Sequence, residues 1–422
     1  MFKKLSEKFK IDTTQLILFL SVIGPGIITA NVDNDVGGIA TYSLAGANFG
    51  YTLLWSLIPI TILLILVQEM SSRMAVATGK GLSDLIRENF GLRVTFYLMI
   101  VLVFVNLANT VSEFAGVAAA GEIFGVSRYI LVPLVAFGVW WLVVKGNYKV
   151  VEKIFLFACL FYISYIISGI MVKPDWHEVA KNTLIPSFQF TSPYIIMLIG
   201  LVGTTIAPWM QFYLQSSVVE KGIRKEDYKY SKIDVIMGCI ITDVVALFII
   251  IATAATIFKV GGSITNASDA AIALKPLAGQ WASYLFAFGL LNAGIFAASI
   301  LPLSTAYTVC EGLGWESGVN KKFSEAKAFY VLYTAMIIIG AVVIMIPGIP
   351  LIPVMYISQI LNGVLIPIIL IYMLKLVNKK ELMGEYTNSK TYNIITWAGS
   401  IIVMILTFLM IIFPLISAVF HI

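Results

Sequence analysis

Two carboxylates, Asp33 and Asp35, interrupt an apolar stretch that runs over residues 16–44, and Gly37 and Gly38 follow them closely. A carboxylate at membrane depth is costly unless it faces water or a cation. Two adjacent glycines in such a stretch predict a helix that is broken rather than kinked. Unwound backbone at that depth is tolerated only where protein or a water-filled cavity receives its polar groups. The combination predicts a cation site inside a membrane protein.

A second helix break is predicted within residues 200–209, where Pro208 removes a backbone donor and glycine and threonine residues precede it. This break contributes Thr204 and Ala207 to the candidate site. A later apolar stretch contributes Gln359, with Asn362 one turn further along the chain. Together with Asp35, these groups predict a metal site that is rich in oxygen ligands.

The donor set favours a hard ion. No Met, Cys or His stands at either break, and Met210 lies beyond Pro208 and Trp209. Carboxylate, carbonyl and water ligands suit Mg²⁺, Ca²⁺ and Mn²⁺, whereas thioethers and thiolates select softer metals. Mg²⁺ usually keeps several of its waters when it binds, and the small residues Gly38 and Ala207 leave volume for them. We therefore expect a partly hydrated divalent cation.

The elements that must position these residues are membrane helices. The chain has 422 residues, of which 59% are hydrophobic and only 12% charged, and this excludes a soluble globular domain. Eleven apolar runs are long enough to cross a bilayer. They cover about 14–44, 51–75, 93–124, 128–145, 150–172, 192–218, 232–258, 279–313, 326–347, 350–376 and 392–418. The predicted fold class is an all-α integral membrane protein with eleven transmembrane helices, in which residues 1–422 form a single transmembrane domain.

The two breaks fall in the first and sixth spans, five spans apart, as expected of a five-plus-five inverted repeat. We expect repeat one over about 14–172, repeat two over about 192–376 and an extra helix over about 392–418. A cytoplasmic N-terminus places 23 of the 28 Lys and Arg residues in the cytoplasm, where such an excess is expected. The C-terminus would then lie outside the cell membrane.

The motif Asp35-Val-Gly-Gly38 is followed in the chain by Ala45-Gly-Ala and then by Gly50-Tyr. This stretch resembles the first span of the Nramp divalent-metal transporters, in which Asp-Pro-Gly-Asn is followed by Ala-Gly-Ala and Gly-Tyr at matching spacing. Three further segments agree: Val76-Ala-Thr-Gly-Lys-Gly-Leu-Ser-Asp-Leu85, Glu113-Phe-Ala-Gly116 and Ser358-Gln359. The resemblance implies a LeuT-type inverted repeat with broken helices 1 and 6. It also implies that Asp35, Thr204 (through its carbonyl) and Gln359 line the metal site, while Gly38 and Ala207 shape it.

Several positions depart from the family pattern. Gly38 replaces the ligand asparagine, and Ala207-Pro208-Trp209 replaces Met-Pro-His. Thr110 stands where the family has a proton-pathway aspartate, three residues before Glu113, and the ninth span lacks the family's basic residues. This combination resembles the Nramp-related magnesium transporters, which carry hydrated Mg²⁺ and Mn²⁺ without proton coupling.

The leading hypothesis is therefore an importer of Mg²⁺, and also of Mn²⁺, that works by alternating access without proton coupling. The metal ion is the substrate and no cofactor is expected. The expected partners are the ion and the lipid bilayer, with no nucleic acid and no ATPase subunit. The candidate pathway residues are Asp33, Thr110, Glu113, Trp209 and Asn362.

Three alternative hypotheses about the function compete with this one. One is a proton-coupled Mn²⁺/Fe²⁺ symporter of the Nramp type, in which Glu113, Asp33 or Asp243 would carry protons. Another is an amino-acid transporter of the same architecture, although two aspartates at the break would repel a substrate carboxylate. An enzyme is disfavoured, because the chain has no HExxH, GxSxG or phosphate-binding loop.

Overall fold

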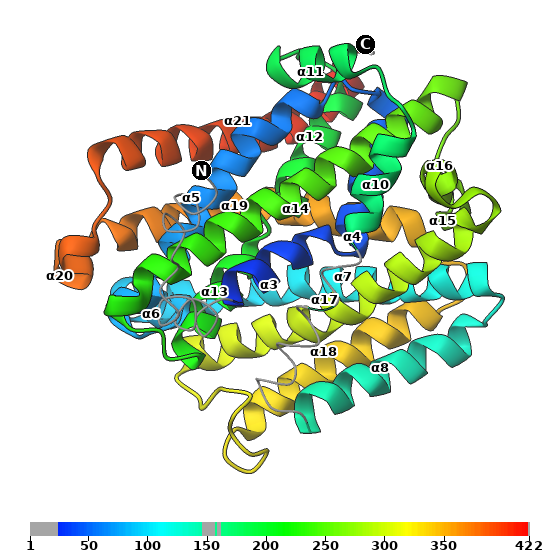
Figure 1. Cartoon of the computed structure of the whole chain (residues 1–422). Helices are drawn as coiled ribbons and strands as arrows, with labels where there is room; N and C mark the ends of the chain where they lie inside the picture. The colour runs from blue at the N-terminus through cyan, green and yellow to red at the C-terminus, as the bar shows by residue number, and fades with distance from the viewer. Residues whose placement is uncertain (1–23, 146–156, 158–161, 421–422) are drawn as a thin grey trace, which may run out of the picture.

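The computed structural model describes residues 24–145, 157 and 162–420, and it is almost entirely helical (Figure 1). The first broken helix comprises α3 (Pro25–Asn31), the 3-10 turn η1 (Val32–Asn34) and α4 (Val36–Phe49), and the second comprises α12 (Ser192–Thr205) and α13 (Pro208–Glu220). The other long helices are α5 (Leu54–Thr78), α7 (Leu92–Phe124), α8 (Arg128–Lys145), α14 (Tyr228–Thr256), α17 (Ala282–Leu313), α18 (Lys327–Met345), α19 (Leu351–Val377) and α21 (Lys390–Phe420). Shorter helices connect them: α6 (Leu82–Phe90), α10 (Ile163–Met171), α11 (Trp176–Leu184), α15 (Ala267–Ala270), α16 (Lys275–Ala278) and α20 (Lys380–Met383).

Nine helical stretches of the described residues are long and apolar enough to cross a membrane. They coincide with nine of the eleven predicted spans. The remaining two are the first span, which is broken and begins before residue 24, and the fifth, part of which lies outside the described residues. The all-helical membrane fold is therefore confirmed, whereas the count of eleven and the limits of the two repeats stay predictions.

The break in the first span lies at Asp35, one residue before α4 begins. Asp35 has extended backbone (φ −65°, ψ −175°) and separates η1 from α4. Gly37 and Gly38 fall inside the first turn of α4 rather than in the unwound part. The sequence thus located the interruption correctly, but the glycines serve close packing instead of unwinding.

The break in the sixth span follows directly from Pro208. The residue before a proline is driven out of helical geometry, and Ala207 is extended (φ −66°, ψ 139°). Proline fits the first position of a helix because no partner is needed for its missing N–H, and α13 begins at Pro208. One helix therefore ends at Thr205 and another begins three residues later.

The two broken helices lie in the interior of the bundle (Figure 1). Here α4 packs against α7, α12, α14 and α19. The most apolar part of the α12–α13 stretch is 94% buried, against 22% for α8 and 17% for α21. Unlike the broken helices, α8 and α21 therefore expose most of their apolar surface, which lipid would cover.

Close backbone contact joins α12 to α19 at Gly203. A Cβ added there would meet the Gln359 carbonyl oxygen and the Gly363 amide nitrogen. Small residues allow membrane helices to approach in this way. Because α19 carries Gln359 and α12 carries Thr204, the contact also sets the distance between two candidate site residues.

We predict that Gly203→Ala destabilises the protein by about 1–3 kcal/mol, as overpacking of a tight core does. Thermal unfolding in detergent should show a clearly lower melting temperature than wild type. The matched control is Gly138→Ala in α8, where an added Cβ meets nothing within 4 Å. Equal melting of the two variants would contradict the close contact.

Candidate metal site

Two carboxylates cap the N-terminus of α4 at the centre of the bundle. The Asp35 side chain accepts a hydrogen bond from the Gly38 N–H at 2.6 Å, and Glu113 Oε2 on α7 accepts one from the Val36 N–H at 3.2 Å. Negative charge is favourable at a helix N-terminus, where N–H groups lack partners. The side chains of Asp35 and Glu113 also interact directly, so a cation beside them would offset the repulsion between two carboxylates.

Glycine at positions 37 and 38 lets three other groups approach the first turn of α4. A Cβ added at Gly38 would meet the Asp33 carbonyl oxygen and would lie 3.0 Å from Thr204 Oγ1, and one at Gly37 would meet Gln359 Nε2. From the sequence we expected the small residue Gly38 to leave room for the waters of a partly hydrated ion. In this structure a hard backbone oxygen, that of the Asp33 carbonyl, stands where a side chain at position 38 would begin.

The end of α12 supplies oxygen atoms to the same region. In an α-helix the Thr204 carbonyl would accept from residue 208, but Pro208 has no N–H to donate. Thr204 Oγ1 is also buried without a hydrogen-bond partner. The Ala207 carbonyl, by contrast, accepts from the Met210 N–H at 3.2 Å and from Gln211 Nε2 at 3.4 Å. Thr204 is therefore the better ligand, and Ala207 shapes the break.

A hydrogen-bonded chain of amides holds Gln359 in place. Asn362 Nδ2 donates to Gln359 Oε1 at 2.9 Å, and Asn109 Nδ2 on α7 donates to Asn362 Oδ1 at 2.8 Å. Asn362 thus orients Gln359 through this chain. Asn109 was missed by the sequence analysis, which had singled out other polar residues within the apolar spans.

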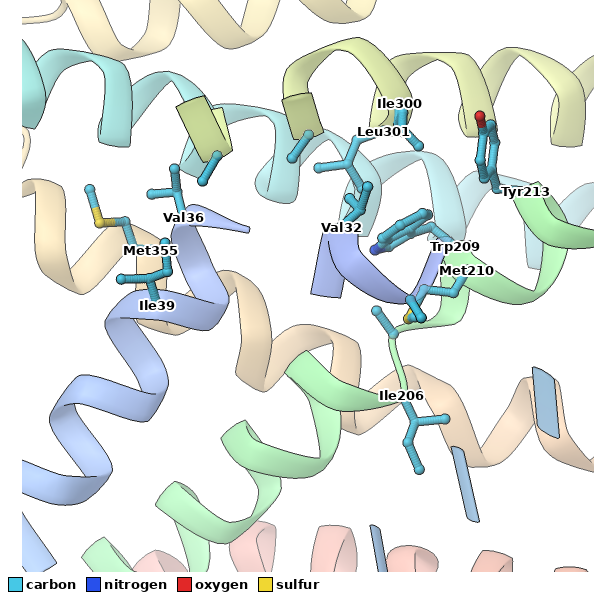
Figure 2. Packing of buried hydrophobic residues seen from close by; sticks show 14 of the residues in the cluster. Val32, Val36, Ile39, Ile206, Trp209, Met210, Tyr213, Ile300, Leu301 and Met355 are labelled. Atoms are coloured by element: carbon cyan, nitrogen blue, oxygen red, sulfur yellow. The ribbon is translucent and has the colours of Figure 1, made fainter. Parts of the chain in front are cut away.

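Two candidate pathway residues pack against neutral groups. The Thr110 hydroxyl donates to the Asn106 carbonyl at 2.9 Å, and its methyl group faces Gly340 of α18. Trp209 is 1% exposed, and Figure 2 shows its indole near Val32 and Leu301. Trp209 therefore fills apolar space between α13, the first broken helix and α17.

Tertiary hydrogen bonds that the sequence analysis missed hold the broken segments in register. Asp234 on α14 accepts from the Gly26 N–H at 2.6 Å and from the Gly24 N–H at 3.1 Å, so it caps α3 from outside. Tyr42 and Thr205 share a hydrogen bond of 2.8 Å between α4 and the end of α12. In the sequence, the capping role of Asp234 is indicated only by the position of a carboxylate near the start of a predicted span.

The site is closed to solvent in this structure. Asp35 is 4% exposed, Thr204 2% and Gln359 1%. Within the described residues, no three His, Cys, Asp or Glu side chains form a group that could hold a metal ion. A metal bound here would therefore need neutral oxygens besides the carboxylates, and the carbonyl-bearing ends of α12 and η1 can offer them.

Comparison with known proteins decides the family. The profile described as "Natural resistance-associated macrophage protein-like", abbreviated Nramp, matches residues 26–413. The chain belongs to the Nramp family. The divalent metal cation transporter MntH of Yersinia pestis (strain Pestoides F) is 29% identical over 399 residues, covering 92% of each chain.

Solved structures confirm the fold. The manganese transporter of Eremococcus coleocola superposes with a TM-score of 0.75 at 21% identity, covering 94% of this chain and 87% of that one. MhsT, solved with L-phenylalanine, gives a TM-score of 0.59 at 12% identity, covering 92% and 97%. This Nramp-family chain therefore has the LeuT-type fold with broken helices that its sequence predicted, and membership of a transporter family agrees with its not being an enzyme.

We predict that Asp234→Ala loosens α3 selectively, because a hydrogen bond to a charged acceptor contributes about 1.5–3 kcal/mol. Hydrogen–deuterium exchange over residues 24–31 should rise at least tenfold, while exchange over α12 stays unchanged. Asp269→Ala is the matched control, since Asp269 caps the distant helix α15. Unchanged exchange over residues 24–31 would show that Asp234 does not hold α3.

Proposed function

We propose that this protein transports divalent metal ions across the membrane and imports Mg²⁺, with Mn²⁺ as a second substrate, without proton coupling. The observation that carries the proposal is the set of groups at the first turn of α4, which are the Asp35 carboxylate, the Asp33 carbonyl oxygen, Thr204 Oγ1 and the Gln359 amide, whose Nε2 atom faces Gly37. Neither Gly38 nor Ala207 adds a soft ligand. Hard oxygen ligands suit Mg²⁺ and Mn²⁺.

The helix ends support a cation at this place. The C-terminal end of a helix carries partial negative charge on its free carbonyls. The turn η1 ends at Asp35, and the last turn of α12 brings Thr204 to Gly38. The positive end of α4 is covered by Asp35 and Glu113. A substrate with a carboxylate, such as an amino acid, would meet these acidic groups instead of free N–H groups.

The membrane potential can drive such an import. An inside-negative potential contributes about 2.3 kcal/mol per charge per 100 mV, so a divalent ion gains roughly twice that. A proton gradient is not required for inward movement. Trp209 supports the uncoupled mechanism, because an indole stands where the family pattern has histidine and it is packed among apolar side chains.

The second candidate function is proton-coupled transport of Mn²⁺ or Fe²⁺. Glu113 favours it, since Glu113 contacts Asp35 while its Oε1 atom has no hydrogen-bond partner. A proton released from one of these carboxylates on metal binding could then move with the ion. Asp33 and Asp243 are further buried carboxylates that this mechanism could use.

We predict that Asp35→Ala abolishes metal binding at this site and abolishes uptake while the protein still folds. Titration calorimetry of the purified protein should lose the Mg²⁺ binding that belongs to the Asp35 site, and proteoliposomes should lose Mn²⁺ uptake. Glu122→Gln is the control, because that carboxylate is 52% exposed and pairs with Arg128 at the surface. Undiminished uptake by Asp35→Ala would overturn the site assignment.

The proposal also predicts that millimolar Mg²⁺ competes with Mn²⁺ uptake and that no protons accompany the metal. Proteoliposomes with an internal pH-sensitive dye measure both properties, with an imposed negative-inside potential. Uptake should rise with the potential and leave the internal pH unchanged. Acidification in step with metal uptake would favour the proton-coupled function instead.

A further inference from the structure

A second group of acidic oxygens lies next to the candidate metal site, between the first broken helix and α14. Asp243 is 5% exposed, and neither of its carboxylate oxygens has a hydrogen-bond partner. Asp33 is 2% exposed and its Oδ1 atom also lacks a partner. Asp35, Glu113 and Asp234, by contrast, each accept backbone N–H groups.

Electrostatics and hydrogen bonds link the segments that carry the two carboxylates. Asp33 interacts electrostatically with Asp243, and the Tyr42 hydroxyl lies 3.5 Å from Asp33 Oδ2. Asn34, the residue after Asp33, donates from Nδ2 to Thr242 Oγ1 at 2.6 Å and to the Thr242 carbonyl at 3.2 Å. These bonds hold the Asn34 amide against the turn of α14 that carries Asp243.

Asn34 gives an independent sign of a missing ligand. Its side chain is completely buried, and Asn34 Oδ1 has no hydrogen-bond partner. A buried acceptor without a partner destabilises the folded protein. The amide nitrogen is fully engaged with Thr242, so the amide cannot turn its oxygen toward another donor without losing two hydrogen bonds.

No cationic side chain of the described residues neutralises the acidic pair. No ion pair among the described residues includes Asp33 or Asp243. The Thr61 hydroxyl on α5 approaches Asp243, but it donates to the Leu57 carbonyl at 2.7 Å. Removing a charged group from water is unfavourable unless a partner offsets the lost hydration.

We propose that Asp33 and Asp243 form a second binding site for a hard divalent cation, beside the site at Asp35. Asn34 Oδ1 and the Tyr42 hydroxyl would complete an all-oxygen donor set. Two carboxylates carry a formal charge of −2, which one divalent ion neutralises, and their oxygens suit Mg²⁺, Mn²⁺ and Ca²⁺. Asp33 belongs to both sites, since its carbonyl lies at Gly38 and its carboxylate interacts with Asp243.

The test is the number of Mn²⁺ ions bound per chain, measured by equilibrium dialysis and electron paramagnetic resonance on the full-length protein in detergent. Wild type should bind two ions. Asp243→Asn keeps the shape of the side chain and should bind one, with at least a hundredfold loss of affinity at the second site. Asp35→Asn should also bind one ion, which stays at the site formed by Asp33 and Asp243. The surface control Glu122→Gln should bind two ions.

The outcomes separate this proposal from the proposed function. A single ion in wild type that is lost with Asp35→Asn and kept with Asp243→Asn would overturn the second site while leaving the transport proposal intact. Two ions bound by Asp243→Asn would overturn it as well. If Asp243→Asn does not yield a monodisperse protein, Asp33→Asn and Tyr42→Phe replace it, and a second-site affinity that neither variant lowers would overturn the proposal.

Discussion

Backbone groups inside a membrane must find partners within the protein, and this constraint governs the structure around the two helix breaks. Each break exposes N–H groups at the start of one half-helix and carbonyl groups at the end of another. At the first break, carboxylates satisfy N–H groups of α4: Asp35 accepts from Gly38 and Glu113 accepts from Val36. A carboxylate has no hydrogen to donate to a carbonyl oxygen. The free carbonyl groups at the helix ends can therefore attract a cation instead.

Close packing converts these separate helix ends into one site. Glycine at positions 37, 38 and 203 removes side chains that would hold α4, α12 and α19 apart. The Asp33 carbonyl, Thr204 and Gln359 therefore reach the same turn of α4. The amide chain from Asn109 to Gln359 and the bond between Tyr42 and Thr205 then fix the orientation of the site.

Much of this arrangement could be predicted from the sequence because its causes are local. Pro208 lacks an N–H and forces Ala207 to be extended, and Asp35 is a charge in an apolar stretch. The family pattern then identified Thr204 and Gln359. The membrane helices followed from long apolar runs, nine of which are helices long enough to cross a membrane in the described part of the chain.

The rest depended on contacts between residues far apart in the chain. Nothing near Asp234 in sequence indicates that it caps α3, more than two hundred residues away. That Gly38 leaves room for water stays a prediction, and the Asp33 carbonyl oxygen lies where a Cβ at Gly38 would be placed. Likewise, the acidic pair Asp33 and Asp243 exists only because η1 packs against α14.

Anomalous diffraction from crystals grown with Mn²⁺ tests the central claim most directly, because it locates the ion without assuming its ligands. The account predicts a strong peak beside Asp35, between the first turn of α4 and the carbonyl end of α12. An ordered, empty region at Asp35 together with a fully occupied ion elsewhere in the membrane interior would contradict it.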